Sequence, residues 1–539
     1  MDNKNPKLRE RVLYLLNPKK GNDAYNKRLR KETMERLKEE QPKMSYGSHG
    51  ASQTLNSLIG WIIEEGNAED NIDLYSSTLR KRARDLFAGG GLARSGPDTL
   101  TTSVVGWGIQ PKPKIDGQFL GMSDEAREEA ERAILREFKL WADNVMCDAE
   151  RQQNFYGLQN LAFLSMLMSG DVFALFGMKE NKRTPYQTTI RLLEADRICT
   201  PDSSGDSEGK ETDSGGRIID GVEIDREGAV IRYYIASRSP AAGNDSSELV
   251  WTSIDAFGKD TGYPNILHVM THERPEQRRG IPFVSGEIEL IKQFTRYMNA
   301  EVAAKLVSAM LTVFITSDED DGKFGMEDAV NDEDKVTDDD LQLELAPGAI
   351  YNLPPGKHID KVDPSRSDSQ FEAFVNTCIM LISSSMGLPK EVITKKYESN
   401  YTAARAALLD FWRTVRVYRT RFNFSFNQPI YEMWLSEAVA TGRIEAPGFF
   451  DDPAIRQAWC GCLWMGASMG HVDPLKEVNA AAMRIQNCIS TQEQEAAEYN
   501  GNDWAENVRQ RIKENEALKD LITSLQPQRY EEDGEDEDE

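Results

Sequence analysis

Apolar residues recur at steps of three and four between Pro282 and about Leu311. This spacing predicts one face of an α-helix, and at 1.5 Å per residue the helix would span roughly 40 Å. The stripe consists of Val284, Ile288, Ile291, Phe294, Met298, Val302, Leu306 and Met310. A small core does not need so long a stripe, so we expect part of it to pack against other subunits.

A second helical pattern follows after an interruption. Its apolar positions are Phe371, Phe374, Val375, Cys378, Ile382 and Met386. Gly387 and Pro389 are expected to end it, because glycine closes helices and proline disfavours helical backbone in the residue before it. The intervening residues 318–340 are dominated by Asp and Glu, so they have little to bury and should project outward.

The rest of the chain predicts a mixed α+β fold. Residues 123–180 are predicted to be helical, with Ser123 as an N-cap, and residues 188–270 show the period of two that indicates strands. A helix ending at Gly89-Gly90-Gly91 is expected before them. Residues 405–440 predict one long Arg-rich helix, and the acidic block at 530–539 predicts a disordered end.

Bulk composition narrows the function classes. The 539 residues allow roughly three or four folding units. No run reaches the ~18 apolar residues of a membrane helix, and no signal peptide is evident, so a soluble cytosolic protein is expected. The net charge of −25 argues against a DNA-coating protein. It is compatible with a conduit, where tight phosphate contacts would hinder movement of DNA.

No catalytic, cofactor or metal site is predicted. The chain lacks Gly-x4-Gly-Lys-Ser/Thr, Gly-x-Ser-x-Gly and His-Glu-x-x-His. Cys460 and Cys462 have no second pair or nearby His, so they are expected to be reduced, buried thiols. His268 and His272 lie four apart, but in a predicted strand, where that spacing does not bring them together on a metal.

Several motifs occur in an order that resembles the lambda-like phage portal proteins. They are Val104–Ile109 after an Arg-rich helix, Asn400-Tyr401-Thr402-Ala403-Ala404-Arg405, the Gln457–Trp464 segment with its Cys-Gly-Cys, and His471–Val478. The resemblance covers about 45–520. It departs at Ala88-Gly-Gly-Gly91, where many relatives carry Arg and Asn, so no function is assigned to those glycines.

The resemblance implies an α+β portal fold that assembles as a closed ring. Its implied parts are a basic N-terminal arm (1–43), an α+β wing (44–281), a first stem helix (282–311), a clip (312–364), a second stem helix (365–387), a tunnel loop (388–404), a long wing helix (405–449), an α-helical crown (450–525) and an acidic tail (526–539).

The resemblance also implies site residues, none of them catalytic. Candidates for the DNA channel are Lys390, Lys395, Lys396, Asn400, Tyr401 and Arg405. Candidates for docking the packaging motor on the clip are Asp318, Glu319, Asp320, Asp321, Asp338, Asp339 and Asp340. Two roles remain open for the arginines of the long helix: contact with passing phosphates, or ion pairs with acids of a neighbouring subunit.

The implied function is a non-enzymatic DNA conduit at one capsid vertex, assembled in the bacterial cytoplasm. Implied partners are further copies of the chain, usually twelve, the terminase large subunit, the capsid or scaffold protein, a head-completion connector and double-stranded DNA read without sequence specificity. The alternative is another ring-shaped virion component, such as a connector or baseplate protein.

Overall fold

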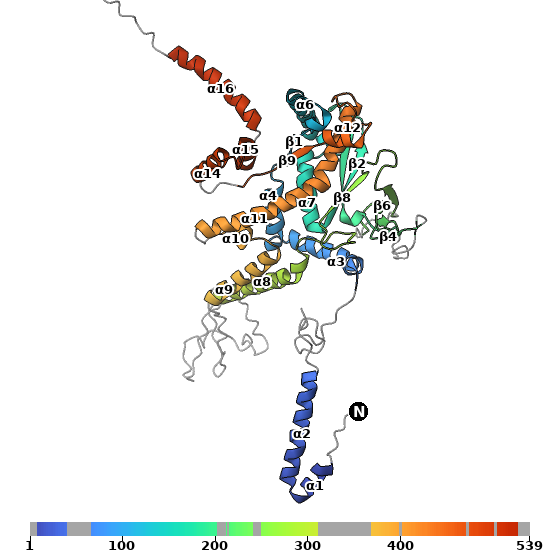
Figure 1. Ribbon diagram of the computed structural model, residues 1–539, viewed down its shortest axis with the longest axis vertical. Helices are drawn as coiled ribbons and strands as arrows, with labels where there is room; N and C mark the ends of the chain where they lie inside the picture. The colour runs from blue at the N-terminus through green and yellow to red at the C-terminus, as the bar shows by residue number, and fades with distance from the viewer. Residues whose placement is uncertain are drawn as a thin grey trace, which may run out of the picture. The chain divides into compact units, whose positions relative to one another are not determined.

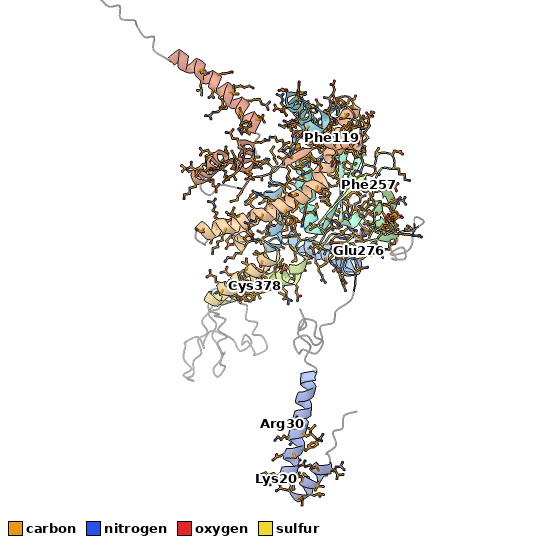
Figure 2. All side chains as sticks on the ribbon, in the orientation of Figure 1. Lys20, Arg30, Phe119, Phe257, Glu276 and Cys378 are labelled. Carbon is orange, nitrogen blue, oxygen red and sulfur yellow. The ribbon has the colours of Figure 1, made fainter. Side chains whose placement is uncertain are left out.

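The computed structural model describes residues 8–39, 66–201, 212, 215–240, 249–310, 368–397, 401–469, 474–500 and 504–525. The chain divides into two compact units, Met1–Gly66 and Asn67–Glu539. The described part of the first unit contains two helices, α1 (Leu8–Leu16) and α2 (Pro18–Glu39). Lys20 and Arg30 lie on α2 (Figure 2). These helices lie within the basic arm that was expected over 1–43.

In the second unit, five described α-helices precede β2 and the strands that follow it, and β1 lies between α4 and α5 (Figure 1). These helices are α3 (Ala68–Ala88), α4 (Leu92–Val104), α5 (Gly117–Leu120), α6 (Asp124–Ala142) and α7 (Phe155–Ser169). The Ser123 side chain accepts a hydrogen bond from the Ala126 amide at 3.3 Å, which confirms the predicted N-cap. Helix α3 ends at the triple glycine, where Gly90 has a φ of 78°.

Strands form three antiparallel sheets in the described residues. The strands are β1 (Gln110–Pro113), β2 (Asp171–Met178), β3 (Thr188–Glu194), β4 (Arg217–Ile219), β5 (Val222–Ile224), β6 (Val230–Ala236), β7 (Trp251–Asp255), β8 (Ile266–Met270) and β9 (Cys462–Met465). Their orders are β3-β2-β8, β4-β5-β6-β7 and β1-β9. The mixed α+β class is confirmed, and strands occupy 188–270 as predicted.

The helical prediction for 123–180 is wrong at its end. Gly170 has a φ of 93° and stops α7, and the next residues form β2, the central strand of its sheet. The alternating pairs that β2 makes on both sides bury Phe173 opposite Leu193 and His268. The apolar run of α7 thus continues into a strand whose first four residues are buried, and periodicity alone does not separate such a run from a buried helix.

The later helices begin with α8 (Ile288–Met310) and α9 (Asp368–Ser385), which lie side by side in Figure 1. The Tyr297 ring contacts Phe374 edge-on at 4.8 Å and stacks near Phe371 at 6.1 Å. Ile291 and Ile382 join the main core at the inner end of the pair. These two helices lie within the segments predicted at 282–311 and 365–387.

The long helix predicted over 405–440 is interrupted. Helix α11 (Tyr401–Phe422) passes into a π-helical segment (Asn423–Asn427) and then α12 (Gln428–Ala440). The stacked rings of Phe422 and Phe426, 5.0 Å apart, both face the core across this irregularity. The extra residue of a π turn lets both aromatic rings point inward.

An aromatic core joins parts that are distant in sequence. Phe138 of α6 meets Trp434 of α12 edge-on at 4.9 Å and Phe155 of α7 at 5.7 Å. Trp459, at the end of α13 (Pro453–Trp459), belongs to the same core. The expected boundary at 449/450 therefore does not separate two cores, because α13 and β9 belong to the body. The remaining helices are α14 (Pro474–Gln486), α15 (Gln492–Asn500) and α16 (Trp504–Leu525).

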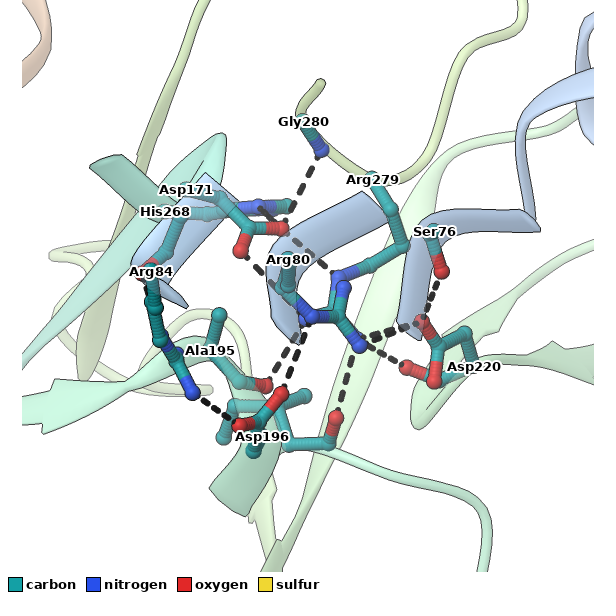
Figure 3. Close-up of polar contacts among 12 residues, drawn as sticks. Ser76, Arg80, Arg84, Asp171, Ala195, Asp196, Asp220, His268, Arg279 and Gly280 are labelled. Carbon is teal, nitrogen blue, oxygen red and sulfur yellow. Dashed lines mark hydrogen bonds and ion pairs between the residues drawn. The ribbon is translucent and has the colours of Figure 1, made fainter. Parts of the chain in front are cut away.

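A buried ion pair connects the β3-β2-β8 sheet to the β4-β5-β6-β7 sheet (Figure 3). The Arg279 Nε donates to Asp171 Oδ2 at 2.7 Å, and both side chains are inaccessible to solvent. The same guanidinium donates to the backbone oxygens of Ala195, Ile198 and Asp220 at 2.7–2.8 Å. Every edge of the guanidinium thus meets an oxygen, which is the condition for burying a charge.

Further charged groups surround this pair. Arg80 of α3 donates to Asp196 at 3.0 Å and lies 3.5 Å from Asp220. Arg84 also pairs with Asp196. Burial opposes ionisation of Asp171, but Arg279 and the His268 hydrogen bond outweigh it, so the pKa of Asp171 lies well below its usual range. We call Arg80, Arg84, Asp171, Asp196, Asp220 and Arg279 the buried ion network.

We expect Asp171→Asn to destabilise the fold by about 3–5 kcal/mol, because it leaves Arg279 buried without its counter-charge. Urea unfolding followed by tryptophan fluorescence measures the loss. The control is Asp255→Asn, which removes the 2.9 Å pair with half-exposed Arg232 and should cost under about 1 kcal/mol. Equal midpoints for the two variants would contradict this account.

Candidate functional site

The segment after α9 is a tight, packed connection. Gly387 closes α9 with a φ of 66°, and its amide donates to the Ser384 oxygen at 3.0 Å. Pro389 then sets the N-terminus of the short helix α10 (Lys390–Thr394). Extended backbone at a residue such as Pro389 suits the position just before a helix.

Helix α10 packs on α4 through Val392 and Ile393, which are buried. The Ser95 hydroxyl donates to the Ile393 oxygen at 2.7 Å. At Gly96 an added Cβ would lie 3.2 Å from the Met386 sulfur, so glycine permits this close approach. Part of the predicted loop at 388–404 is therefore an anchored helix, because two apolar residues at its centre reach the core.

The three candidate lysines lie on this anchored segment. Lys390 begins α10, Lys395 ends it with a φ of 55°, and Lys396 follows; all three are exposed. Lys395 borders a hollow of about 390 Å³ whose other lining comes from the loop before α4 and one face of that helix: Gly91, Arg94, Ser95, Asp98, Thr99, Thr102 and Ser103. The three lysines are therefore exposed, although the segment that carries them is packed against the core.

Two other candidates are described only in part. Asn400 lies outside the described residues, and Tyr401 begins α11 without a described side chain. The candidate acids of the clip, Asp318, Glu319, Asp320, Asp321, Asp338, Asp339 and Asp340, also lie outside the described residues.

Two arginines of α11 pair with acids of the same chain. Arg405 Nη2 lies 3.6 Å from Glu477 of α14, and Arg416 lies 3.7 Å from Glu498 of α15. Sequence reasoning left phosphates or a neighbouring subunit's acids as their partners. Acids of the C-terminal helices were not foreseen, since they are more than seventy positions away in the sequence.

Arg419 has a structural role that the sequence did not indicate. Its guanidinium donates to the oxygens of Ser103, Val104 and Ala467 at 2.7–2.9 Å. Burial, together with the charge of Arg416, lowers the pKa of Arg419 to about 10, so the side chain stays charged at neutral pH. It joins the end of α4, helix α11 and the chain after β9.

His268 and Cys460 occupy structural positions in the described part of the chain. His268 lies on β8, 3.3 Å from Asp171, and burial lowers its pKa despite that carboxylate. Burial likewise raises the pKa of the Cys460 thiol. The described residues contain no cluster of His, Cys, Asp and Glu suited to a metal ion. None of the described helices is long and apolar enough to cross a membrane.

Comparison with known proteins identifies the family. The model of the lambda family of phage portal proteins matches residues 55–419. Portal protein B of Escherichia phage lambda is 23% identical over 455 residues, covering 80% of this chain and 82% of that protein. The portal protein of Escherichia phage N15 is 23% identical over 491 residues, covering 87% of this chain and 89% of that protein.

Solved structures are more distant. A chain from the neck of an empty gene transfer agent particle matches with a TM-score of 0.40 and 13% identity, covering 67% of this chain and 82% of its own length. A chain from the virion of a native gene transfer agent particle has a TM-score of 0.40 and 11% identity, covering 77% and 89%.

The chain belongs to the lambda family of phage portal proteins. It is a structural, non-enzymatic component of the phage virion. The family resemblance expected from the ordered motifs is therefore confirmed, and a connector or baseplate protein is set aside.

We expect Arg419→Met to lower stability by roughly 2–3 kcal/mol, because several charge-assisted hydrogen bonds to buried carbonyl groups are lost. Thermal unfolding of the purified chain measures the effect. Arg413→Met is the matched control, since Arg413 is exposed on the same helix and should change stability by under about 0.5 kcal/mol. A neutral Arg419 variant would contradict the structural role.

Proposed function

We propose that the chain assembles into a closed ring, of about twelve copies by family resemblance, that forms the DNA channel at one vertex of the phage capsid. Closed rotational symmetry requires each subunit to bury one surface against a different surface of its neighbour. The observation that carries the proposal is a set of exposed apolar side chains along α8 and α9.

On α8 these side chains continue the stripe that begins in the core. Along α8 the apolar positions pass from buried Ile291 through half-buried Met298 to exposed Val302 and Leu306. The exposed apolar side chains of the pair, with their exposed fractions, are Val302 (56%), Leu306 (54%), Phe374 (48%), Met380 (50%) and Leu381 (53%). Several large apolar side chains exposed on one helix pair favour a protein contact, and the stem of a ring would supply one.

We expect Val302→Asp with Leu306→Asp to prevent ring assembly while leaving the subunit folded, because charges would replace apolar groups at the subunit contact. Light scattering measures the mass, and circular dichroism checks the fold. Met178→Asp with Phe257→Asp is the control, since both side chains are exposed elsewhere on the body, with Phe257 labelled in Figure 2. A ring of normal mass in the Val302/Leu306 variant would remove the proposed contact.

The channel role is proposed for Lys390, Lys395, Lys396, Asn400, Tyr401 and Arg405. The exposed lysines on the packed α10 segment support it, because a ring would repeat each charge in every subunit. Such contacts with phosphate are weak and screened by salt, which suits DNA that moves through a channel.

Lys395→Ala with Lys396→Ala should leave ring mass unchanged and lower the amount of retained DNA by roughly two- to tenfold, since each exposed charge contact contributes under about 1 kcal/mol. Packaging assays with nuclease protection measure retention. The control, Lys179→Ala with Lys182→Ala, removes two exposed lysines between β2 and β3. Normal retention in both variants would argue against a channel role, and loss of rings would indicate a structural one.

The proposed partners follow from the family. Residues 312–364 would form the clip, and its acids would dock the terminase large subunit during packaging and a head-completion connector afterwards. The capsid or scaffold protein would surround the wing. The energy for packaging would come from the terminase, because this sequence contains no Gly-x4-Gly-Lys-Ser/Thr loop. Assembly would take place in the bacterial cytoplasm.

A further inference from the structure

We propose that α14 and α15 form an acidic cover over a basic row, Lys112, Arg405 and Arg416, and that the phosphates of double-stranded DNA displace this cover. This inference rests on the proposed channel function, because it concerns when the arginines of α11 become available to DNA. On this proposal, the acids of α14 and α15 compete with DNA phosphates for Lys112, Arg405 and Arg416.

Three ion pairs connect the basic row to the cover. Lys112 Nζ of β1 lies 2.6 Å from Glu493, Arg405 lies 3.6 Å from Glu477, and Arg416 lies 3.7 Å from Glu498. In every pair the cation comes from the body and the acid from α14 or α15. Arg405 and Arg416 are eleven residues apart, close to three helical turns, so they lie on the same face of α11.

The cover is held as one piece by a pair of its own. Arg484 of α14 donates through Nε and Nη2 to the two carboxylate oxygens of Glu495 in α15, at 2.8 and 2.6 Å. This two-pronged geometry is the strong form of an ion pair. Loss of the contacts with the body would therefore release α14 and α15 together.

Apolar packing of the cover is slight in the described structure. No described residue of α14, α15 or α16 is buried. Leu475, Val478 and Met483 of α14 are exposed, although a helix that packs by its apolar stripe would cover them. Since the three pairs with the body are ionic and partly exposed, they are weak and sensitive to salt.

DNA is the competitor that this arrangement fits. A duplex presents one phosphate per ~1.7 Å of its axis, so it offers many anions at once to a row of cations. Each of Glu477, Glu493 and Glu498 offers one carboxylate, and displacement exchanges that carboxylate for a phosphate. Because the exchange replaces one ionic contact by another, the cover can return after the DNA has passed.

Hydrogen exchange measured by mass spectrometry on the assembled full chain tests the inference. Helices as short as α14 and α15 are marginal when they lose their contacts, so displacement should raise exchange over 474–500. We expect a several-fold rise between about 0.05 and 0.5 M NaCl. We also expect a rise when a short double-stranded DNA is added at constant ionic strength.

The variant Glu477→Gln/Glu493→Gln/Glu498→Gln should show the fast exchange already at low salt and respond no further. The control Glu506→Gln/Glu514→Gln/Glu516→Gln removes the same charge from exposed positions on α16 and should behave as the unmodified chain. Exchange in the unmodified chain that ignores salt or DNA would overturn the inference, as would slow exchange in the first variant.

Light scattering on the same samples separates this inference from the proposed function. A chain that forms no ring under any salt condition contradicts the proposed function. A ring whose cover ignores both salt and DNA contradicts only the inference drawn from α14 and α15.

Discussion

The body of this portal subunit depends on the buried pair between Asp171 and Arg279. The two residues meet where the chain segments at Gly170 and Gly280 cross, so closely that a side chain at either glycine would strike the other backbone. At that crossing, Arg279 holds the oxygens of Ala195, Ile198 and Asp220. The crossing fixes β2 against the second sheet, and Arg80 and Arg84 add α3 to it.

Local patterns in the sequence predicted some of these elements and missed others. Periodicity located α8, α9 and the strands of 188–270, since those patterns are local. It missed β2, because an apolar run after α7 fits a buried helix and a buried strand equally well. It also missed the pairing of β1 with β9, whose partners Gln110 and Met465 are 355 positions apart, and local patterns carry no signal for such a contact.

The sequence likewise predicted some features of the candidate site and missed others. Gly387 and Pro389 correctly marked the end of α9, and the lysines near them are exposed as a channel role needs. The burial of Val392 and Ile393 could not be inferred, because two apolar residues between charged neighbours are too short a pattern. The role of Arg419 could not be inferred either, because the carbonyl groups that it binds belong to Ser103, Val104 and Ala467, which are distant in the sequence.

The subunit has exposed apolar side chains that contacts with neighbouring subunits in a ring would bury. Its body packs around an aromatic core and a buried ion network, whereas α8 and α9 leave apolar side chains exposed to solvent. The most direct measurement is an electron cryomicroscopy reconstruction of the purified full chain without imposed symmetry. We predict a closed ring with a central opening and α8 and α9 packed between neighbours. Particles of one or two subunits, or rings in which Val302 and Leu306 face solvent, would contradict it.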